Sequence, residues 1–222
     1  MAKINAIGNK TSNLTIDPGA SGDSFVQYSV NGVDKYRAGF DDSATEFKLS
    51  KGSALGTNDH LVVTQDGEQT LPLQPAFLAY LSTTMVNATG TDATGLVTIP
   101  FDTEVFDIGS NYNTSTGVFT APVAGKYCFS AYCTLDDLPA DDRRLFFRVI
   151  VDATSFLHHL SNPRYVHVSG VYVTGSDAFY SMDAADEAKV QVSVYDGASD
   201  DVDIVGSAAT ELKTYFSGYL AC

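Results

Sequence analysis

The chain has 222 residues, of which 44% are hydrophobic and 18% are charged. This composition is typical of a globular protein, and the length accommodates one large β domain or two modest ones. The formal net charge of −14 repels phosphate backbones, which excludes nucleic acid as an expected partner.

The beginning of the chain, "MAKINAIGNKTSNLTIDPG", lacks the basic region and apolar run of a secretory signal peptide. No stretch approaches 18 consecutive apolar residues, so membrane insertion is not expected either. We therefore expect the chain to be made and folded in a cytoplasm, unless a non-standard exporter handles it. Cys128, Cys133 and Cys222 are expected to be reduced thiols, with a bridge involving Cys222 as the alternative.

Residues 1–75 carry short apolar clusters separated by Gly, Asn, Asp and Ser. The Asn-Gly in "SVNGVDKYRAGF" lies between two apolar runs, which is a strong hairpin signal. "EFKLS" and "HLVVT" each predict a short strand. Because this zone holds too few apolar residues for a core of its own, we expect it to share a core with copies of itself or with a larger structure.

Pro72 and Pro75 mark a boundary, after which strand patterns recur with turn signals between them. Many short strands at this spacing predict an antiparallel sandwich or barrel, and helical patterns are scarce. The expected strands are 76–82, 96–101, 103–108, 116–121, 126–135, 143–152, 155–160, 165–174, 178–183, 188–196, 202–206 and 213–221.

Alternation within two of these strands separates their faces. The expected core face of 126–135 consists of Tyr127, Phe129, Ala131, Cys133 and Leu135. In 143–151, Phe146 and Ile150 share a face with Arg144 and Arg148. That mixture suits a subunit contact with a polar margin, so we expect Phe146 and Ile150 at an interface between copies of the chain.

The stretch "NTSTGVFTAPVAGKYCFSAY" (113–132) combines a turn, a short strand ended by a proline and a strand with an aromatic face. It resembles the C1q-like globular domain, whose Gly-x-Phe-x-x-Pro-x-x-Gly-x-Tyr-x-Phe run is carried here by Gly117, Phe119, Pro122, Gly125, Tyr127 and Phe129. "PFDTEVFDIG" and the closing "TYFSGYLAC" resemble two further strands of that family. One departure is Ala185-Asp186, where the family usually has Gly-Asp.

This resemblance covers about residues 76–222 and implies a tumour-necrosis-factor-like jelly roll that packs as a homotrimer. The preceding segment, above all "KGSALGTNDHLVVT", is similar to β-rich segments of phage fibre and tail proteins, and it contains no collagen Gly-X-Y stalk. We therefore expect an all-β protein with a small β-rich attachment segment over 1–75 and a trimeric C1q-like head over 76–222.

The sequence contains no phosphate loop, dinucleotide fingerprint, His-Glu-x-x-His or Cys-x-x-Cys, and enzymatic activity is not expected. Recognition is expected in the loops of the head, where sequence varies without disturbing the sheets. His158, His159, Arg164 and Tyr165 offer binding contacts there. His158 and His159 would point to opposite faces of a strand, which disfavours a shared metal ion.

Acidic loops are a candidate metal site. Asp200, Asp201 and Asp203 bring carboxylate oxygens close together in the sequence, and such hard ligands suit Ca²⁺, which relatives of this fold bind. Solvated turn residues that form Asx-turns are the alternative explanation.

These features together favour a non-enzymatic bacteriophage fibre or appendage protein located in the virion. Its N-terminal segment would contact other virion proteins, and its head would bind a host-surface receptor or glycan. A capsid decoration fibre is a close variant, and a cellular C1q-like adhesion or lectin-like module is the alternative from another class.

Overall fold

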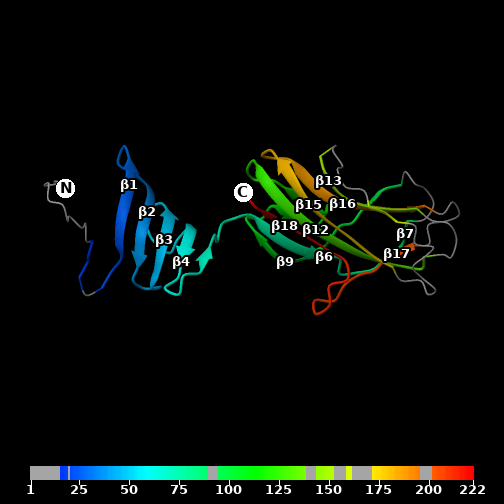
Figure 1. Ribbon diagram of the computed structural model, residues 1–222, viewed down its shortest axis with the longest axis horizontal. Coiled ribbons are helices and arrows are strands. Elements are labelled where there is room, and N and C mark those ends of the chain that lie inside the picture. Colours follow the sequence, from blue (N-terminus) through cyan, green and yellow to red (C-terminus); the bar gives the residue numbers. More distant parts are fainter. Residues whose placement is uncertain are drawn as a thin grey trace. The chain divides into compact units, whose positions relative to one another are not determined.

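The computed structural model describes residues 16–19, 21–89, 95–138, 144–152, 159–161, 172–195 and 202–222. These residues form strands, turns and irregular segments, and none of them is helical, which confirms the predicted all-β class. None of the described segments is therefore a helix of the length and apolarity that crossing a membrane requires. The chain divides into two compact units, Met1–Leu73 and Gln74–Cys222, drawn in Figure 1.

The first unit is one antiparallel sheet whose strands follow each other in chain order. Its strands are β1 (Ser24–Val30), β2 (Val33–Asp41), β3 (Glu46–Lys51), β4 (Asp59–Val63) and β5 (Gln69–Thr70). The predicted hairpin is present between β1 and β2, where Asn31 and Gly32 both adopt positive φ, 52° and 77°. Two such residues form the type I′ turn that matches the twist of paired strands.

One side of this sheet carries a buried ionic cluster. The Lys48 ammonium lies 2.8 Å from an oxygen of Asp41, 3.2 Å from Glu46 and 3.7 Å from Asp59. The loop that follows β3 closes over this side, since Leu55 is buried and Gly56 approaches the Asp41 carboxylate. Asp41 and Glu46 accept hydrogen bonds from the ammonium and Asp59 adds a third negative charge nearby, where water has little access.

The second unit, called the head below, is a sandwich of two antiparallel sheets (Figure 1). The first sheet has the order β10-β11-β16-β13-β14, with β8 also paired to β16. Its strands are β8 (Val97–Thr98), β10 (Tyr112–Asn113), β11 (Val118–Thr120), β13 (Arg144–Val151), β14 (His159–Ser161) and β16 (Glu187–Tyr195).

The second sheet of the head has the order β7-β17-β12-β18-β6-β9, with β15 on the other edge of β12. Its strands are β6 (Ala76–Tyr80), β7 (Met85–Thr89), β9 (Thr103–Ile108), β12 (Gly125–Asp136), β15 (Tyr172–Met182), β17 (Val202–Ile204) and β18 (Tyr215–Leu220). Strands distant in sequence are neighbours in both sheets, which is the connectivity of a jelly roll.

Aromatic rings fill the space between the two sheets. The Phe77 ring lies 4.8 Å from that of Tyr112 and 4.9 Å from those of Phe119 and Phe216. The predicted core face of β12 is confirmed, because Tyr127, Phe129, Ala131, Cys133 and Leu135 are all fully buried. Each fully buried ring of this size stabilises the fold by roughly 1.5–3 kcal/mol.

The glycine–aromatic motif therefore has a structural explanation. Phe119, Tyr127 and Phe129 are core residues, and the Tyr127 hydroxyl donates to the Val123 carbonyl at 2.8 Å. Gly117 has a φ of 71°, and a Cβ there would lie 2.4 Å from the Ile99 carbonyl oxygen. Only glycine combines that conformation with that close approach.

Four strands differ from the sequence-based prediction. β5, β7 and β10 were not expected, because β5 and β10 have two residues each and Asn87 interrupts β7 with a φ of 52°. The polar run Gly175-Ser176-Asp177 suggested a break between two strands, 165–174 and 178–183. It instead continues through the middle of β15, since all eleven residues of β15 pair with β12.

Candidate assembly and binding surfaces

The second sheet of the head has an outer face rich in aromatic and apolar side chains, here called the aromatic face. Alternation turns Cys128, Ser130 and Tyr132 of β12 away from the core, and their paired neighbours turn with them. One row across the sheet contains Phe179, Cys128, Tyr219 and Ala76; the next contains Asp177, Ser130, Ser217, Leu78 and Phe106; the third contains Gly175, Tyr132, Tyr215 and Tyr80.

Several of these side chains are open to solvent in the single chain. Phe179 is 70% exposed, Tyr219 49% and Phe106 45%. A hollow of about 640 Å³ lies on the same face and is lined by Leu78, Phe106, Tyr215 and Tyr219 among others. Large apolar residues grouped on one face mark a surface that another molecule covers.

The middle of the aromatic face is closely packed. The rings of Tyr132 and Tyr215 stack with their centroids 5.2 Å apart. Gly175, directly opposite Tyr132 on β15, leaves room for this ring, because a Cβ at that position would lie 2.7 Å from it. The stack presents a flat, preformed patch rather than mobile side chains.

The middle of the aromatic face carries little charge for so acidic a chain, whereas Lys126, Asp136 and Asp203 lie on the same side of the sheet beyond the three rows. Asp177 is the one carboxylate in the three rows named above, although the chain as a whole has a net charge of −14. A face of this composition can meet a copy of itself without bringing many like charges together.

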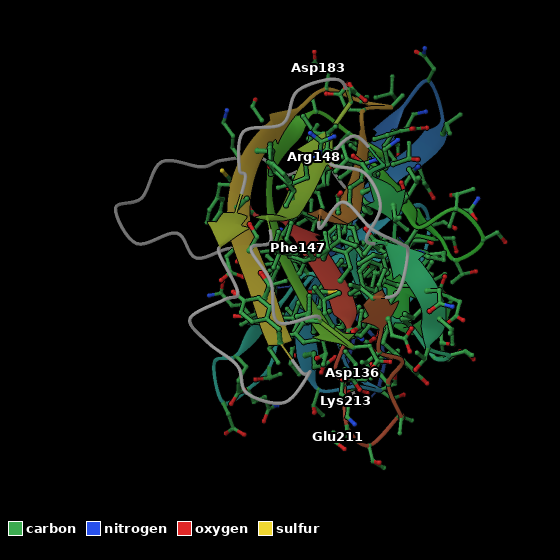
Figure 2. The ribbon with its side chains drawn as sticks, turned by 90° about the vertical axis from the view of Figure 1, so that its right-hand side faces the viewer. Asp136, Phe147, Arg148, Asp183, Glu211 and Lys213 are labelled. Atoms are coloured by element: carbon green, nitrogen blue, oxygen red, sulfur yellow. The ribbon has the colours of Figure 1, made fainter. Side chains whose placement is uncertain are left out.

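The first sheet presents the outward side of β13, where Phe146 and Ile150 were expected to contact another copy. The predicted alternation is confirmed: Leu145, Phe147, Val149 and Val151 are buried in the core, and Phe147 and Arg148 are neighbours on the strand (Figure 2). Arg148 donates to the Gln191 side-chain oxygen at 2.7 Å, and Gln191 in turn donates to Thr98 at 3.2 Å.

This side of β13 leaves little open apolar surface within the single chain. Ile150 is only 9% exposed and Phe146 is half-buried. The assignment of Phe146 and Ile150 to a trimer interface stays a prediction. The aromatic face is a competing candidate for that interface, because its apolar side chains are more exposed.

The predicted binding residues lie mostly outside the described part of the chain. His158, Arg164 and Tyr165 belong to segments that the structure does not describe. His159 is the first residue of β14, where its backbone pairs with Phe147. Their role in recognition stays a prediction.

The proposed calcium ligands are divided in the same way. Asp200 and Asp201 are outside the described residues, whereas Asp203 lies on β17 and accepts the Asn87 backbone N–H at 2.8 Å. Asp203 thus has a structural partner. Among the residues that the structure describes, no group of three His, Cys, Asp or Glu side chains is arranged to hold a metal ion.

A second acidic stretch ends β12. Asp136 accepts the Asp137 backbone N–H at 2.9 Å, and Asp137 has a φ of 57°. Asp136 lies in the same part of the head as Glu211 and Lys213, at the opposite end from Asp183 (Figure 2). These contacts fit the turn chemistry expected as the alternative to calcium binding.

The ionisable groups buried in the head are core residues. Burial raises the pKa of the Cys133 thiol well above its usual range, so this cysteine stays protonated. Burial also raises the pKa of Tyr112, whose hydroxyl donates to the Phe101 carbonyl at 3.2 Å. Cys128, Cys133 and Cys222 form no disulfide bond in the structure. Cys133 and Tyr112 contribute to the packing of the core.

Sequence reasoning missed the aromatic face, although part of its signal was visible. The alternation in 126–135 already placed Cys128, Ser130 and Tyr132 on one side of that strand. Phe179 and Tyr219 could be added only with the pairing of β15 and β18 to β12, which joins residues about 50 and 90 positions apart.

The head is a two-sheet jelly roll whose exposed aromatic face is a candidate surface for binding or assembly. The chain belongs to the C1q domain family, whose sequence model matches residues 76–221. No curated protein matches the chain.

Solved structures similar to the head include two of animal origin. The globular domain of zebrafish complement 1qA protein has a TM-score of 0.46 at 19% identity, covering 67% of this chain and 98% of that one. Murine APRIL at pH 8.5 has a TM-score of 0.45 at 8% identity, covering 66% and 98%.

Proposed function

We propose that this chain is a non-enzymatic virion structural protein of a bacteriophage, a fibre or appendage whose trimeric head binds the host surface. The observation that carries the proposal is the aromatic face on a C1q domain. That face is a surface for association with another molecule.

Three heads pack around one axis through their aromatic faces. Phe179, Tyr219 and Phe106 lose their exposure to water in this arrangement, and the stacked Tyr132 and Tyr215 provide rigid contact area. The resemblance of the head to trimeric jelly rolls supports the number three. Binding of the host then gains from three identical sites on one particle.

Recognition takes place in loops of the head. The proposed contacts are His158, His159, Arg164 and Tyr165, whose rings and cationic groups suit a glycan or the polar surface of a receptor protein. The loops are suited to this role because the two sheets hold the fold without them.

The virion location rests on the first unit. Residues 24–70 form a β-sheet and the chain has no collagen Gly-X-Y stalk, while the sequence of this segment is similar to β-rich segments of phage fibre and tail proteins. A fibre on the tail and a decoration fibre on the capsid both fit this architecture. The cellular C1q-like adhesion module is the competing proposal, and it fits the same head.

Purified virions test the proposal. An antibody against the head should label the particles in electron micrographs, on the tail or on the capsid, and peptides of this chain should be found by mass spectrometry after gradient purification. Added recombinant head should compete with the virions for adsorption to host cells. A chain absent from the particles but present on producing cells would overturn the virion role and favour the adhesion module.

A further inference from the structure

The sheet of the first unit has a side that no other strand among the described residues of that unit covers, here called the open face. Cross-strand pairing places on it Val26 and Tyr28 of β1, Tyr36, Ala38 and Phe40 of β2, Phe47 and Leu49 of β3, and Leu61 and Val63 of β4. Tyr28 is 54% exposed, Phe47 45% and Val26 40%. Nine apolar or aromatic side chains thus form one continuous surface.

The opposite side is closed by the chain itself. The Lys48 cluster, Leu55 and Val62 are buried there, and Arg37 lies 4.0 Å from the centre of the Phe25 ring. A single sheet needs a second layer to bury its apolar side. Among the described residues of this unit, the loop after β3 supplies that layer on the closed side, and none supplies it on the open face.

The distribution of charged residues in the first unit indicates which kind of molecule supplies that layer. The nine side chains of the open face are uncharged at neutral pH, whereas Asp41, Glu46 and Asp59 all lie on the closed side. Two basic residues border the nine: Lys51 is paired with Tyr36, and the His60 ring lies 5.6 Å from the Tyr36 ring. A chain with a net charge of −14 would repel its own copies over most of its surface. The open face is a region where copies can meet without that repulsion.

We propose that the open faces of three copies of this chain pack against one another and form a shared core. The inference rests on the proposed trimeric head, because a five-residue connection, 71–75, joins β5 to β6. Such a connection extends no further than about 18 Å. Three heads on one axis therefore hold three open faces at an effective concentration of order millimolar. At that concentration, each open face binds the open faces of the other two copies in preference to a soluble partner.

Photo-crosslinking of the full chain tests which molecule covers the open face. With p-benzoylphenylalanine in place of Phe47, we expect covalent dimers of the chain whose crosslinks map to residues of β1–β4 in the second copy. The same probe in place of Ser53, an exposed residue of the loop on the closed side, is the matched control and should give no such product. Crosslinks from position 47 to the head of the same chain, or to a different protein in virions, would overturn the proposal.

A second variant separates this inference from the head trimer. Phe47→Glu places a carboxylate on the open face, and we expect the mass of a trimer in light scattering with loss of hydrogen-exchange protection in β2 and β3. A trimer with unchanged protection would overturn the shared core and leave the proposed head trimer standing. A wild-type chain that stays monomeric would overturn both.

Discussion

At the scale of single residues, Ala185 is strained. It has a φ of 76° in the turn between β15 and β16, where Asp186 donates its backbone N–H to Asp183 at 3.2 Å. An L-residue in this conformation costs about 1–2 kcal/mol of folding free energy. Replacing it by glycine removes this cost but recovers only part of it as stability, because glycine also makes the unfolded chain more flexible. Ala185→Gly should therefore stabilise the head by about 0.5–1 kcal/mol in thermal unfolding. Ala184→Gly, one residue earlier and without positive φ, should not; equal effects of the two changes would refute the explanation.

The Lys48 cluster predicts acid sensitivity of the first unit. Hydrogen bonds from Lys48 and then Ser43 lower the pKa of Asp41 from its usual 3.8 to about 2. A carboxylate with a lowered folded-state pKa contributes stability that is complete above pH 4 and is lost as the pH falls toward 2. The hydrogen bond that Lys48 donates to Asp41 also raises the pKa of Lys48, so the stability contributed by the charged Lys48 is lost only at strongly alkaline pH.

Pulse proteolysis with pepsin can measure this loss, since pepsin is active in acid. We expect pepsin to cleave the wild type within residues 24–70 faster at pH 2 than at pH 4. We expect it to cleave the Asp41→Asn variant fast at both pH values, because this variant loses about 1.5–3 kcal/mol of stability, the contribution of a hydrogen bond to a charged group. Asp66→Asn, in an exposed turn, is the control and should behave as wild type. A variant with the wild-type profile would show that Asp41 is not the sensitive group.

At the scale of elements, the sequence predicted the features that depend on local residue patterns. Alternation assigned the buried faces of β12 and β13, and Asn31-Gly32 located the first hairpin. The sequence pattern did not reveal that Gly175-Ser176-Asp177 stays within a strand, because eleven cross-strand pairs between β15 and β12 override the local preference of these residues for a turn. Nor did it show that Ile150, outward on its strand, is covered within the chain, since burial depends on segments distant in sequence.

The acidic stretch that contains Asp200, Asp201 and Asp203 offers a test of the calcium prediction. Asp203 already holds the Asn87 backbone, so its removal should cost stability with or without metal. Asp200→Ala combined with Asp201→Ala should leave the melting temperature in chelator nearly unchanged and abolish a rise caused by millimolar Ca²⁺. If calcium raises the melting temperature of the wild type no more than that of the double variant, these aspartates are turn residues and not ligands.

At the scale of the whole molecule, assembly balances charge against apolar burial. A trimer triples a net charge of −14, but salt at 0.15 M limits repulsion to about 8 Å. Each aromatic side chain that becomes buried in the trimer offsets this electrostatic repulsion by roughly 1.5–3 kcal/mol. Phe179, at 70% exposure, has more area to bury than Phe146, which is half-buried, or Ile150 at 9%. The balance favours a trimer held by the aromatic face.

Matched substitutions on the two candidate faces decide which one holds the trimer. In size exclusion with light scattering at 0.15 M salt, we expect a wild-type trimer at micromolar concentration. Phe179→Asp should release folded monomers, because its carboxylate would be desolvated beside Cys128 and Tyr219 in the packed face. Phe146→Asp should remain trimeric. The reverse outcome would return the interface to β13, as Phe146 and Ile150 first suggested, and a folded wild-type monomer under these conditions would exclude both faces.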